Sequence, residues 1–315
     1  MAKTKIILPA SFYEEEKRGD TLVSKDTKRL WAVELDLFQE LKRVCEKHNI
    51  KFFAISGTLI GAARHHGFIP WDDDIDVVML RSEYKKLENV ASEFIDPYFF
   101  QTNYTDPGSL RGHAQLRNSS TTAILENEIY NGVPLGSFNQ GIFLDIFPLD
   151  KLPNDLEERK TFMETLIRLK NRIKLLKYYR SFLHNWYRYP KSYKGLKVIV
   201  HGIIQKMTEM VSRKDFLADA YKEFDGFAQK YNQTDSRECS PITFSQRLRQ
   251  HEVFNVSDFD EHDELDFEMF KIPCPKNYDE VLTRAFGNWR TPVIGKNTHG
   301  HLMIDLDKSY RDYLR

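Results

Sequence analysis

Four aspartates in five residues, placed between apolar segments, are the feature that most constrains this chain. They are Asp72, Asp73, Asp74 and Asp76, within the stretch KFFAISGTLIGAARHHGFIPWDDDIDVVM that runs from residue 51 to residue 79. Burying charged carboxylates is unfavourable unless they are paired or bind a cation. Apolar residues flank the run and no lysine lies within it, which argues against a solvated acidic turn. We therefore expect a functional site in this stretch.

The residues before the acidic run predict a strand, a tight turn and a short helix. Residues 51–56 are strand-like through their Phe-Phe-Ala-Ile core. Gly57 then permits the turn into the helix. The first backbone N–H groups of a helix that follows a strand can hold phosphate oxygens. Ser56, Gly57 and Thr58 are therefore predicted to bind substrate phosphate, the first and last of them also through their hydroxyl groups.

The acidic run itself predicts a metal site. If residues 74–79 form a strand, Asp74 and Asp76 lie on one face, because side chains alternate along a strand. On this alternation Asp73 points the opposite way and is structural. Two carboxylates so close repel each other unless a cation lies between them. Mg²⁺ or Mn²⁺ is the expected ion, since hard cations bind carboxylate oxygens and keep positions open for substrate phosphates.

A calcium loop is an alternative interpretation of the same residues. Asp72, Asp74 and Asp76 match the first three ligand positions of an EF-hand, and Glu83 stands at the twelfth. The sixth position requires a glycine for its sharp turn, but Val77 occupies it. The strand-like run that follows also disfavours this interpretation.

Four segments of the chain together carry a family resemblance. Two are long blocks, SGTLIGAARHHGFIPWDDDIDVVML at residues 56–80 and QGIFLDIFPLD at residues 140–150. Two match more loosely, LRNSSTTAI at residues 116–124 and FKIPCPKNYDEVLTRAFGNWRTP at residues 270–292. They resemble the LicD family of phosphotransferases, within the nucleotidyltransferase-like superfamily. The resemblance implies an α+β (mixed α/β) fold, with a nucleotidyltransferase-like core sheet, flanking helices and a helical basic insertion.

Asp145 is the next candidate, because it stands alone in the apolar, strand-like run of residues 141–148. A lone buried aspartate requires a cation or hydrogen bonds. With Asp74 and Asp76 it completes the three-carboxylate metal site that the resemblance implies, in which a pair of acids on one strand meets a single acid on a neighbouring strand. A hydrogen bond to backbone is the structural alternative for Asp145. Asp150 is expected to be a helix cap or a turn residue.

Positive and proton-accepting groups complete the predicted site. Arg64 and Arg117 are expected to bind pyrophosphate oxygens, because a guanidinium group contacts phosphate through two parallel hydrogen bonds. His65, beside Arg64, is a further candidate for substrate contact, with a structural role at a helix end as the alternative. Asp145, or Asp72 if it reaches inward, would accept the proton from an attacking hydroxyl.

Overall composition excludes several classes of protein. The chain has 46 Lys and Arg against 46 Asp and Glu, and this zero net charge argues against a general nucleic-acid binder. Its three cysteines are widely spaced and predict reduced thiols. The apolar run near the N-terminus is too short for a signal peptide, and no stretch approaches the ~18 apolar residues of a spanning helix. A cytoplasmic location is expected.

Residues 165–208 differ from the rest, with eleven Lys or Arg and no Asp or Glu, interleaved with aromatic residues. Helices are predicted over residues 166–183 and 196–210. Basic residues mixed with interfacial aromatics suit peripheral contact with an anionic membrane, here the inner face of the cell membrane. A helical insertion packed on the core and an RNA-binding surface are the alternatives.

The remaining segments complete the predicted organisation. Apolar residues at three- and four-residue steps predict a helix from residue 24 to about residue 48, with Ser24 or Asp26 as its cap. Residues 265–272 are expected to form a strand and residues 278–286 a helix. His299 and His301 stand two residues apart, but without a third ligand at zinc spacing they do not predict a zinc site. We divide the chain into a catalytic core over 1–150, a helical insertion rich in basic and aromatic residues over 151–235, and a C-terminal part over 236–315 that completes the catalytic domain.

The resemblance implies a reaction that these residues could perform. Phosphocholine, or another phosphorylated alcohol, would pass from a CDP-linked donor such as CDP-choline to a sugar hydroxyl of a glycan, lipid-linked glycan or teichoic acid precursor, with release of CMP. One alternative is a nucleotidyltransferase, which transfers a nucleoside monophosphate. The other is a non-catalytic protein that binds a metal and a membrane.

Overall fold

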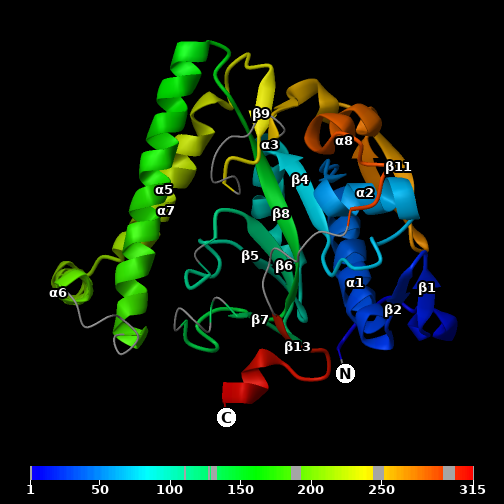
Figure 1. Cartoon of the computed structure of the whole chain (residues 1–315), viewed down its shortest axis with the longest axis horizontal. Coiled ribbons are helices and arrows are strands. Elements are labelled where there is room, and N and C mark those ends of the chain that lie inside the picture. The colour runs from blue at the N-terminus through cyan, green and yellow to red at the C-terminus, as the bar shows by residue number, and fades with distance from the viewer. Residues whose placement is uncertain are drawn as a thin grey trace.

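The computed structural model describes the chain in seven segments, residues 2–109, 111–126, 128, 133–185, 193–243, 252–293 and 302–314. Within them the fold is mixed α+β, which confirms the sequence prediction (Figure 1). The histidines considered for zinc, His299 and His301, lie outside the described residues, as does part of the basic segment. No helix among the described residues is long and apolar enough to cross a bilayer.

Among the described residues, seven strands form one sheet around β8 (Ile142–Lys151). Strand β4 (Asp76–Leu80) runs parallel to β8, and this register places Asp76 directly opposite Asp145. Strand β6 (Ala114–Asn118) pairs antiparallel with the other edge of β8. The outer strands are β3 (Phe53–Ala54), β5 (Tyr98–Gln101), β9 (Glu238–Ser240) and β10 (Phe254–Asn255).

Helix α1 (Lys25–Lys47) packs against strands β6 and β8 of this sheet. Ser24 caps it, because its hydroxyl oxygen accepts a hydrogen bond from the Thr27 backbone N–H at 3.1 Å. Apolar residues recur at three- and four-residue steps and bury one face of the helix, as the sequence predicted. These contacts fix α1 beside the segment that leads into β4.

The other helices flank the sheet on both sides. In Figure 1, α5 and α7 lie along one side of β8, whereas α1, α2 and α8 lie on the other, and α6 stands at the periphery. Helix α8 has the bounds that the sequence predicted. The helices are α2 (Ser56–His65), α3 (Arg81–Asn89), α5 (Leu156–Asn185), α6 (Tyr193–Ser212), α7 (Phe216–Ala228) and α8 (Tyr278–Phe286).

The strands outside the main sheet form three antiparallel pairs, one of which corrects the sequence analysis. The single strand expected over residues 265–272 is a hairpin that turns at Glu268, whose φ of 56° lies in the left-handed region. Alternating polar and apolar residues on both sides of this turn concealed it. The pairs are β1 (Glu16–Arg18) with β2 (Thr21–Val23), β11 (His262–Phe267) with β12 (Phe270–Pro275), and β7 (Thr122–Leu125) with β13 (Leu302–Asp305).

A buried ion pair joins the sheet to the helical region. Arg81, at the start of α3, donates two hydrogen bonds to Asp150, at 2.8 Å and 2.6 Å, and also contacts Asp225 of α7 at 3.1 Å. Asn232 donates a further hydrogen bond to Asp150 at 2.7 Å. The prediction that Asp150 is a cap or turn residue was wrong, because β8 continues through it and buries it completely.

Two apolar cores lie on either side of this ion pair. The larger surrounds the sheet and α1, and the smaller gathers residues of α5 and α7, among them Leu166, Leu169 and Phe224. The three cysteines are free thiols within the protein interior, which confirms the reduced state expected from their spacing. The domain boundaries at residues 150 and 235 stay a prediction.

We predict that Arg81→Met lowers the free energy of unfolding by about 3–5 kcal/mol, because it leaves the Asp150 carboxylate buried without its partner. Urea unfolding followed by circular dichroism measures this change. The control is Arg172→Met, which removes an exposed ion pair with Glu223 and should change stability by less than about 1 kcal/mol. Equal effects of the two substitutions would contradict the assignment.

Candidate functional site

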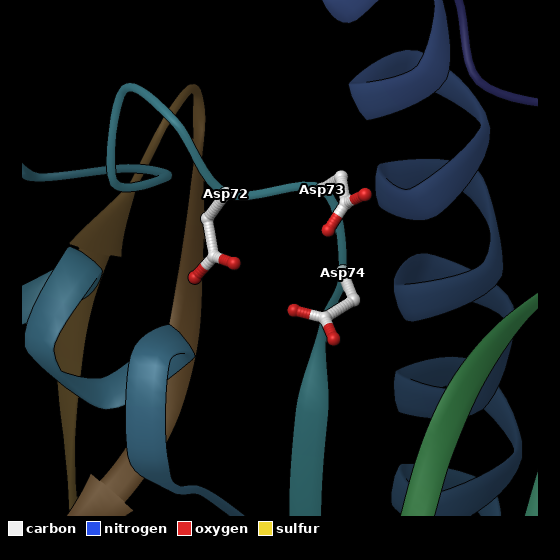
Figure 2. A group of neighbouring side chains, drawn as sticks. All are labelled: Asp72, Asp73 and Asp74. Carbon is white, nitrogen blue, oxygen red and sulfur yellow. The ribbon is translucent and has the colours of Figure 1, made fainter. Parts of the chain in front are cut away.

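Three consecutive aspartates form an acidic loop between α2 and β4 (Figure 2). Asp72, Asp73 and Asp74 each offer a carboxylate oxygen, and these oxygens lie within 4.8 Å of one another. The Trp31 indole N–H donates to the backbone carbonyl of Asp72 at 2.9 Å, and the Asp72 N–H donates to the carbonyl of Ile69 at 2.9 Å. Both contacts involve the Asp72 backbone, so the start of the acidic loop is closed by a turn and held against α1.

The place where β4 begins changes one sequence prediction. The strand begins at Asp76, two residues later than expected, so residues 72–74 lie in the loop. The alternation of a strand does not apply there, and Asp73 belongs to the acidic group although it was predicted to point away. Asp74 lies with Asp72 and Asp73 before the strand.

Asp72 rests on the first turn of α2. A Cβ atom on Gly57 would lie 2.5 Å from the Asp72 carboxylate oxygen Oδ2, so the absence of a side chain at Gly57 leaves room for this carboxylate. Burial raises the pKa of Asp72 to about 7, helped by the negative charges of Asp74 and Asp73. The same turn aligns the acidic loop with β4, because the Thr58 hydroxyl oxygen accepts a hydrogen bond from the Asp76 backbone N–H at 2.8 Å.

Asp76 and Asp145 occupy facing positions on the parallel strands β4 and β8. Oδ1 of Asp76 is buried and has no hydrogen-bond partner among the described residues. Burial raises the pKa of Asp76 well above its usual value, and the charges of Asp74, Asp145 and Asp72 raise it further. Asp76 is therefore a buried carboxyl whose ionised form lacks a compensating group.

Asp145 has the opposite environment. His113 Nε2 lies 3.1 Å from its Oδ1, and the Gln115 amide donates to the same oxygen at 2.6 Å. Burial alone would raise the pKa of Asp145, but His113, Gln115 and the charge of Arg111 lower it below its usual value. The sequence analysis missed His113 and Gln115. The sequence feature that could have identified them is a polar residue at every second position of a strand that is otherwise apolar and buried.

The predicted phosphate-binding cations lie in different surroundings. Arg117 is almost fully buried, and its guanidinium group donates to the Gly141 carbonyl at 2.6 Å, to Gln101 at 2.6 Å and to Gln115. It supports the side chain that holds Asp145, and its contact with phosphate stays a prediction. Burial lowers the pKa of Arg117 to about 9.

Arg64 and His65 lie at the C-terminal end of α2, whereas the acidic loop meets the N-terminal end. Seven residues of helix separate Gly57 from Arg64, which corresponds to about 10 Å along the axis. Arg64 donates to the backbone carbonyl of Trp289 at 2.7 Å and to His65 Nε2 at 2.9 Å. Desolvation lowers the pKa of both side chains. Substrate contact through them stays a prediction.

Glu34 is a further acidic group near the loop, which the sequence analysis missed. This residue of α1 is 2% exposed, and its Oε2 has no hydrogen-bond partner among the described residues. Burial raises its pKa well above the usual value, with Asp74 as the largest charge effect. With Asp73 and Asp74 it lines a small cavity that also has apolar walls. A glutamate within the buried stripe of α1, four residues after Leu30, was the available signal.

The residues present fit a divalent cation. The charged groups that act on Asp76 are the carboxylates of Asp74, Asp145 and Asp72, and hard cations prefer oxygen ligands of this kind. The buried, unpartnered oxygen of Asp76 and the raised pKa values around it show a local excess of negative charge. A bound cation would compensate this charge, as neighbouring protein groups do for Asp145.

We predict that metal-free protein loses stability through Asp72 as pH rises. Its pKa of about 7 in the folded state exceeds the usual aspartate value of 3.8, so the folded state binds more protons between these two pH values. The contribution of Asp72 is present at low pH and is lost as pH approaches about 7. In EDTA, Asp72→Asn should therefore gain stability relative to wild type as pH rises from about 5 to about 8. Thermal unfolding of both proteins at the two pH values measures this change. A constant difference across this range would contradict the prediction.

Comparison with known proteins agrees with this geometry. The model of the LicD/FKTN/FKRP nucleotidyltransferase domain matches residues 49–192, a segment that contains the acidic loop, β4 and β8. Lipopolysaccharide cholinephosphotransferase LicD of Haemophilus influenzae is 35% identical over 133 residues, which cover 38% of this chain and 42% of that protein.

Two further relatives are uncharacterised proteins. RP689 of Rickettsia prowazekii is 40% identical over 74 residues, covering 22% of this chain and 26% of its own length. RT0683 of Rickettsia typhi is 35% identical over 95 residues, covering 28% of this chain and 31% of its own length. The matched segments span less than half of each relative. Residues 49–192 of this chain therefore match the LicD-family nucleotidyltransferase domain.

Proposed function

We propose that this protein is a metal-dependent phosphotransferase that moves phosphocholine from CDP-choline to a sugar hydroxyl of a cell-surface glycan or a teichoic acid precursor. CMP would be the second product. The observation that carries the proposal is the pairing of Asp76 with Asp145 across β4 and β8, beside the acidic loop, within a LicD-family domain. The name of the Haemophilus relative supports the choline head group.

Asp74, Asp76 and Asp145 are the residues that would hold Mg²⁺ or Mn²⁺. When bound, the ion would neutralise the charge of the diphosphate and stabilise the leaving nucleotide oxygen. His113 and Gln115 orient Asp145 by hydrogen bonds to one of its oxygens. Hydrogen bonds of this kind to a metal-binding carboxylate typically fix its orientation.

The first turn of α2 would bind the phosphate groups of the donor. Ser56 and Gly57 begin this helix, and its unpaired N–H groups favour anions. The Thr58 hydroxyl is already bonded to the Asp76 backbone, so it would position the carboxylate in addition to any contact with phosphate. Arg64 and Arg117 remain the proposed cations for the other phosphate oxygens.

Asp72 is the better candidate for the general base. A base works best when its pKa lies near the working pH, and burial places the pKa of Asp72 at about 7. Asp145 is held ionised by His113 and Gln115, which lowers its pKa and suits a cation ligand. Asp72 would accept the proton of the attacking sugar hydroxyl.

We also propose that the protein meets its glycan acceptor at a membrane. A lipid-linked glycan lies at a bilayer surface, and residues 165–208 carry the basic charge that would favour peripheral contact with anionic lipid at the inner face of the membrane. A cytoplasmic location stays a prediction.

A nucleotidyltransferase is the alternative function, favoured by the domain description that matches this chain. The two activities differ in which phosphorus atom is attacked. Product analysis separates them: the phosphotransferase releases CMP, whereas a nucleotidyltransferase acting on a nucleoside triphosphate releases pyrophosphate.

We predict acceptor-dependent CMP release when the protein is incubated with Mg²⁺, a sugar acceptor and one of CDP-choline, CDP-ribitol or CDP-glycerol. Asp76→Asn should lower the rate by at least about 100-fold, because loss of a cation ligand removes several kcal/mol of transition-state stabilisation. Removal of the metal with EDTA should abolish release, and added Mg²⁺ should restore it.

The control for this assay is Asp219→Asn, an exposed aspartate of α7 outside the site, which should leave the rate unchanged. Circular dichroism of each variant checks that the fold is retained. Turnover by folded Asp76→Asn at the wild-type rate would contradict the assignment of Asp76 to the catalytic site. Pyrophosphate release from a nucleoside triphosphate in place of CMP release would establish the alternative.

A further inference from the structure

Helix α6 presents an apolar face that no described part of the chain covers. Seven of its apolar side chains are exposed, with Met207 at 62%, Met210 at 70% and Val211 at 86%. At about 3.6 residues per turn, the seven positions fall within an arc of about 120° of the helix surface. They are Leu196, Val200, Ile203, Ile204, Met207, Met210 and Val211. We call this surface the α6 apolar face.

The opposite face of α6 packs against α5. Gly195 and Gly202 are buried seven residues apart on this inner face. Glu209, which is the sole acidic residue of α6, turns inward, where it accepts a hydrogen bond from Gln205 at 3.0 Å and lies 3.6 Å from Arg180. The α6 apolar face therefore carries no acidic side chain.

Basic residues border the α6 apolar face. Lys197 lies next to one edge of the arc and Lys206 next to the other, and both are exposed. Arg213 and Lys214 follow the helix and are also exposed. Lysine stems can lie along apolar surface while the ammonium group reaches a polar layer. This arrangement matches a bilayer interface, with acyl chains below the apolar arc and anionic headgroups at its edges.

We infer that α6 lies in the interface of an anionic bilayer, with the α6 apolar face inserted among the lipids. Exposed apolar patches of this kind are uncommon on monomeric soluble proteins and mark an interaction surface. Lysine is depleted at protein–protein interfaces, so lysines along both edges favour lipid over a protein partner. Because α6 cannot span the bilayer, it binds parallel to the membrane plane.

Within the basic segment of residues 165–208, the inference assigns membrane contact to α6 and gives this helix a defined orientation on the bilayer. It rests on the side chains of α6 and is independent of the proposed chemistry. The bilayer would hold the protein where lipid-linked acceptors reside. Its failure and the failure of the phosphotransferase proposal give different results, because vesicle binding requires no donor and CMP release with a water-soluble acceptor requires no vesicle.

The test is co-sedimentation of the full chain with vesicles. We expect binding to mixed phosphatidylcholine–phosphatidylglycerol vesicles, weakened by salt, and much weaker binding to phosphatidylcholine alone. The double variant Ile203→Gln/Met207→Gln should bind at least about 10-fold less, because two exposed apolar groups no longer enter the bilayer. Lys197→Gln/Lys206→Gln should lose about fivefold per lysine on anionic vesicles.

The matched control is Ile7→Gln/Met269→Gln, which changes two exposed apolar residues outside α6 and should leave vesicle binding unchanged. Circular dichroism confirms that each variant folds. Three results would overturn the inference: no binding of wild type to anionic vesicles, equal binding to both lipid compositions, or equal loss in the control. A dimer in solution that Ile203→Gln/Met207→Gln dissociates would also overturn it, because a second copy would then cover the face.

Discussion

Electrostatic repulsion among closely spaced carboxylates is the constraint on which the site depends. Parallel pairing of β4 with β8 brings Asp76 opposite Asp145, and the acidic loop adds three further carboxylates. The protein compensates only part of this charge, since His113 and Gln115 hold Asp145 while an oxygen of Asp76 has no partner among the described residues. Such repulsion lowers the stability of the fold, and functional sites commonly have this effect.

The surrounding scaffold resists this repulsion through contacts to the backbone of the acidic segment. Trp31 holds the carbonyl of Asp72, and Thr58 holds the N–H of Asp76. Both residues belong to helices that pack against strands of the main sheet, α1 against β6 and β8 and α2 against β4. Farther along β8, the buried pair of Arg81 and Asp150 joins the strand to α7. These contacts hold the backbone from which the carboxylates of Asp72 and Asp76 project.

The sequence predicted those features that local patterns specify. Apolar periodicity and a serine cap located α1, and the acidic run located the site. It could not show that β4 begins at Asp76, because polar and apolar residues already alternate from Asp74, two residues before the strand begins. Glu34 and His113 reach the site through tertiary packing, which no spacing along the chain encodes. The apolar arc of α6 was present in the sequence, but basic and aromatic composition concealed it.

The chain has zero net charge, but its acidic and basic residues lie in different places. This separation bears on the order in which a cation, a donor and a membrane would bind. Acidic groups gather at the site, whereas basic residues gather on α5 and α6. A CDP-linked donor carries a negatively charged diphosphate, so the uncompensated carboxylates would repel it. The donor would then enter only with a cation, either after the ion or as its complex. The basic surface, in contrast, would attract anionic lipid directly under our proposal, so association with a membrane would require neither ion nor donor.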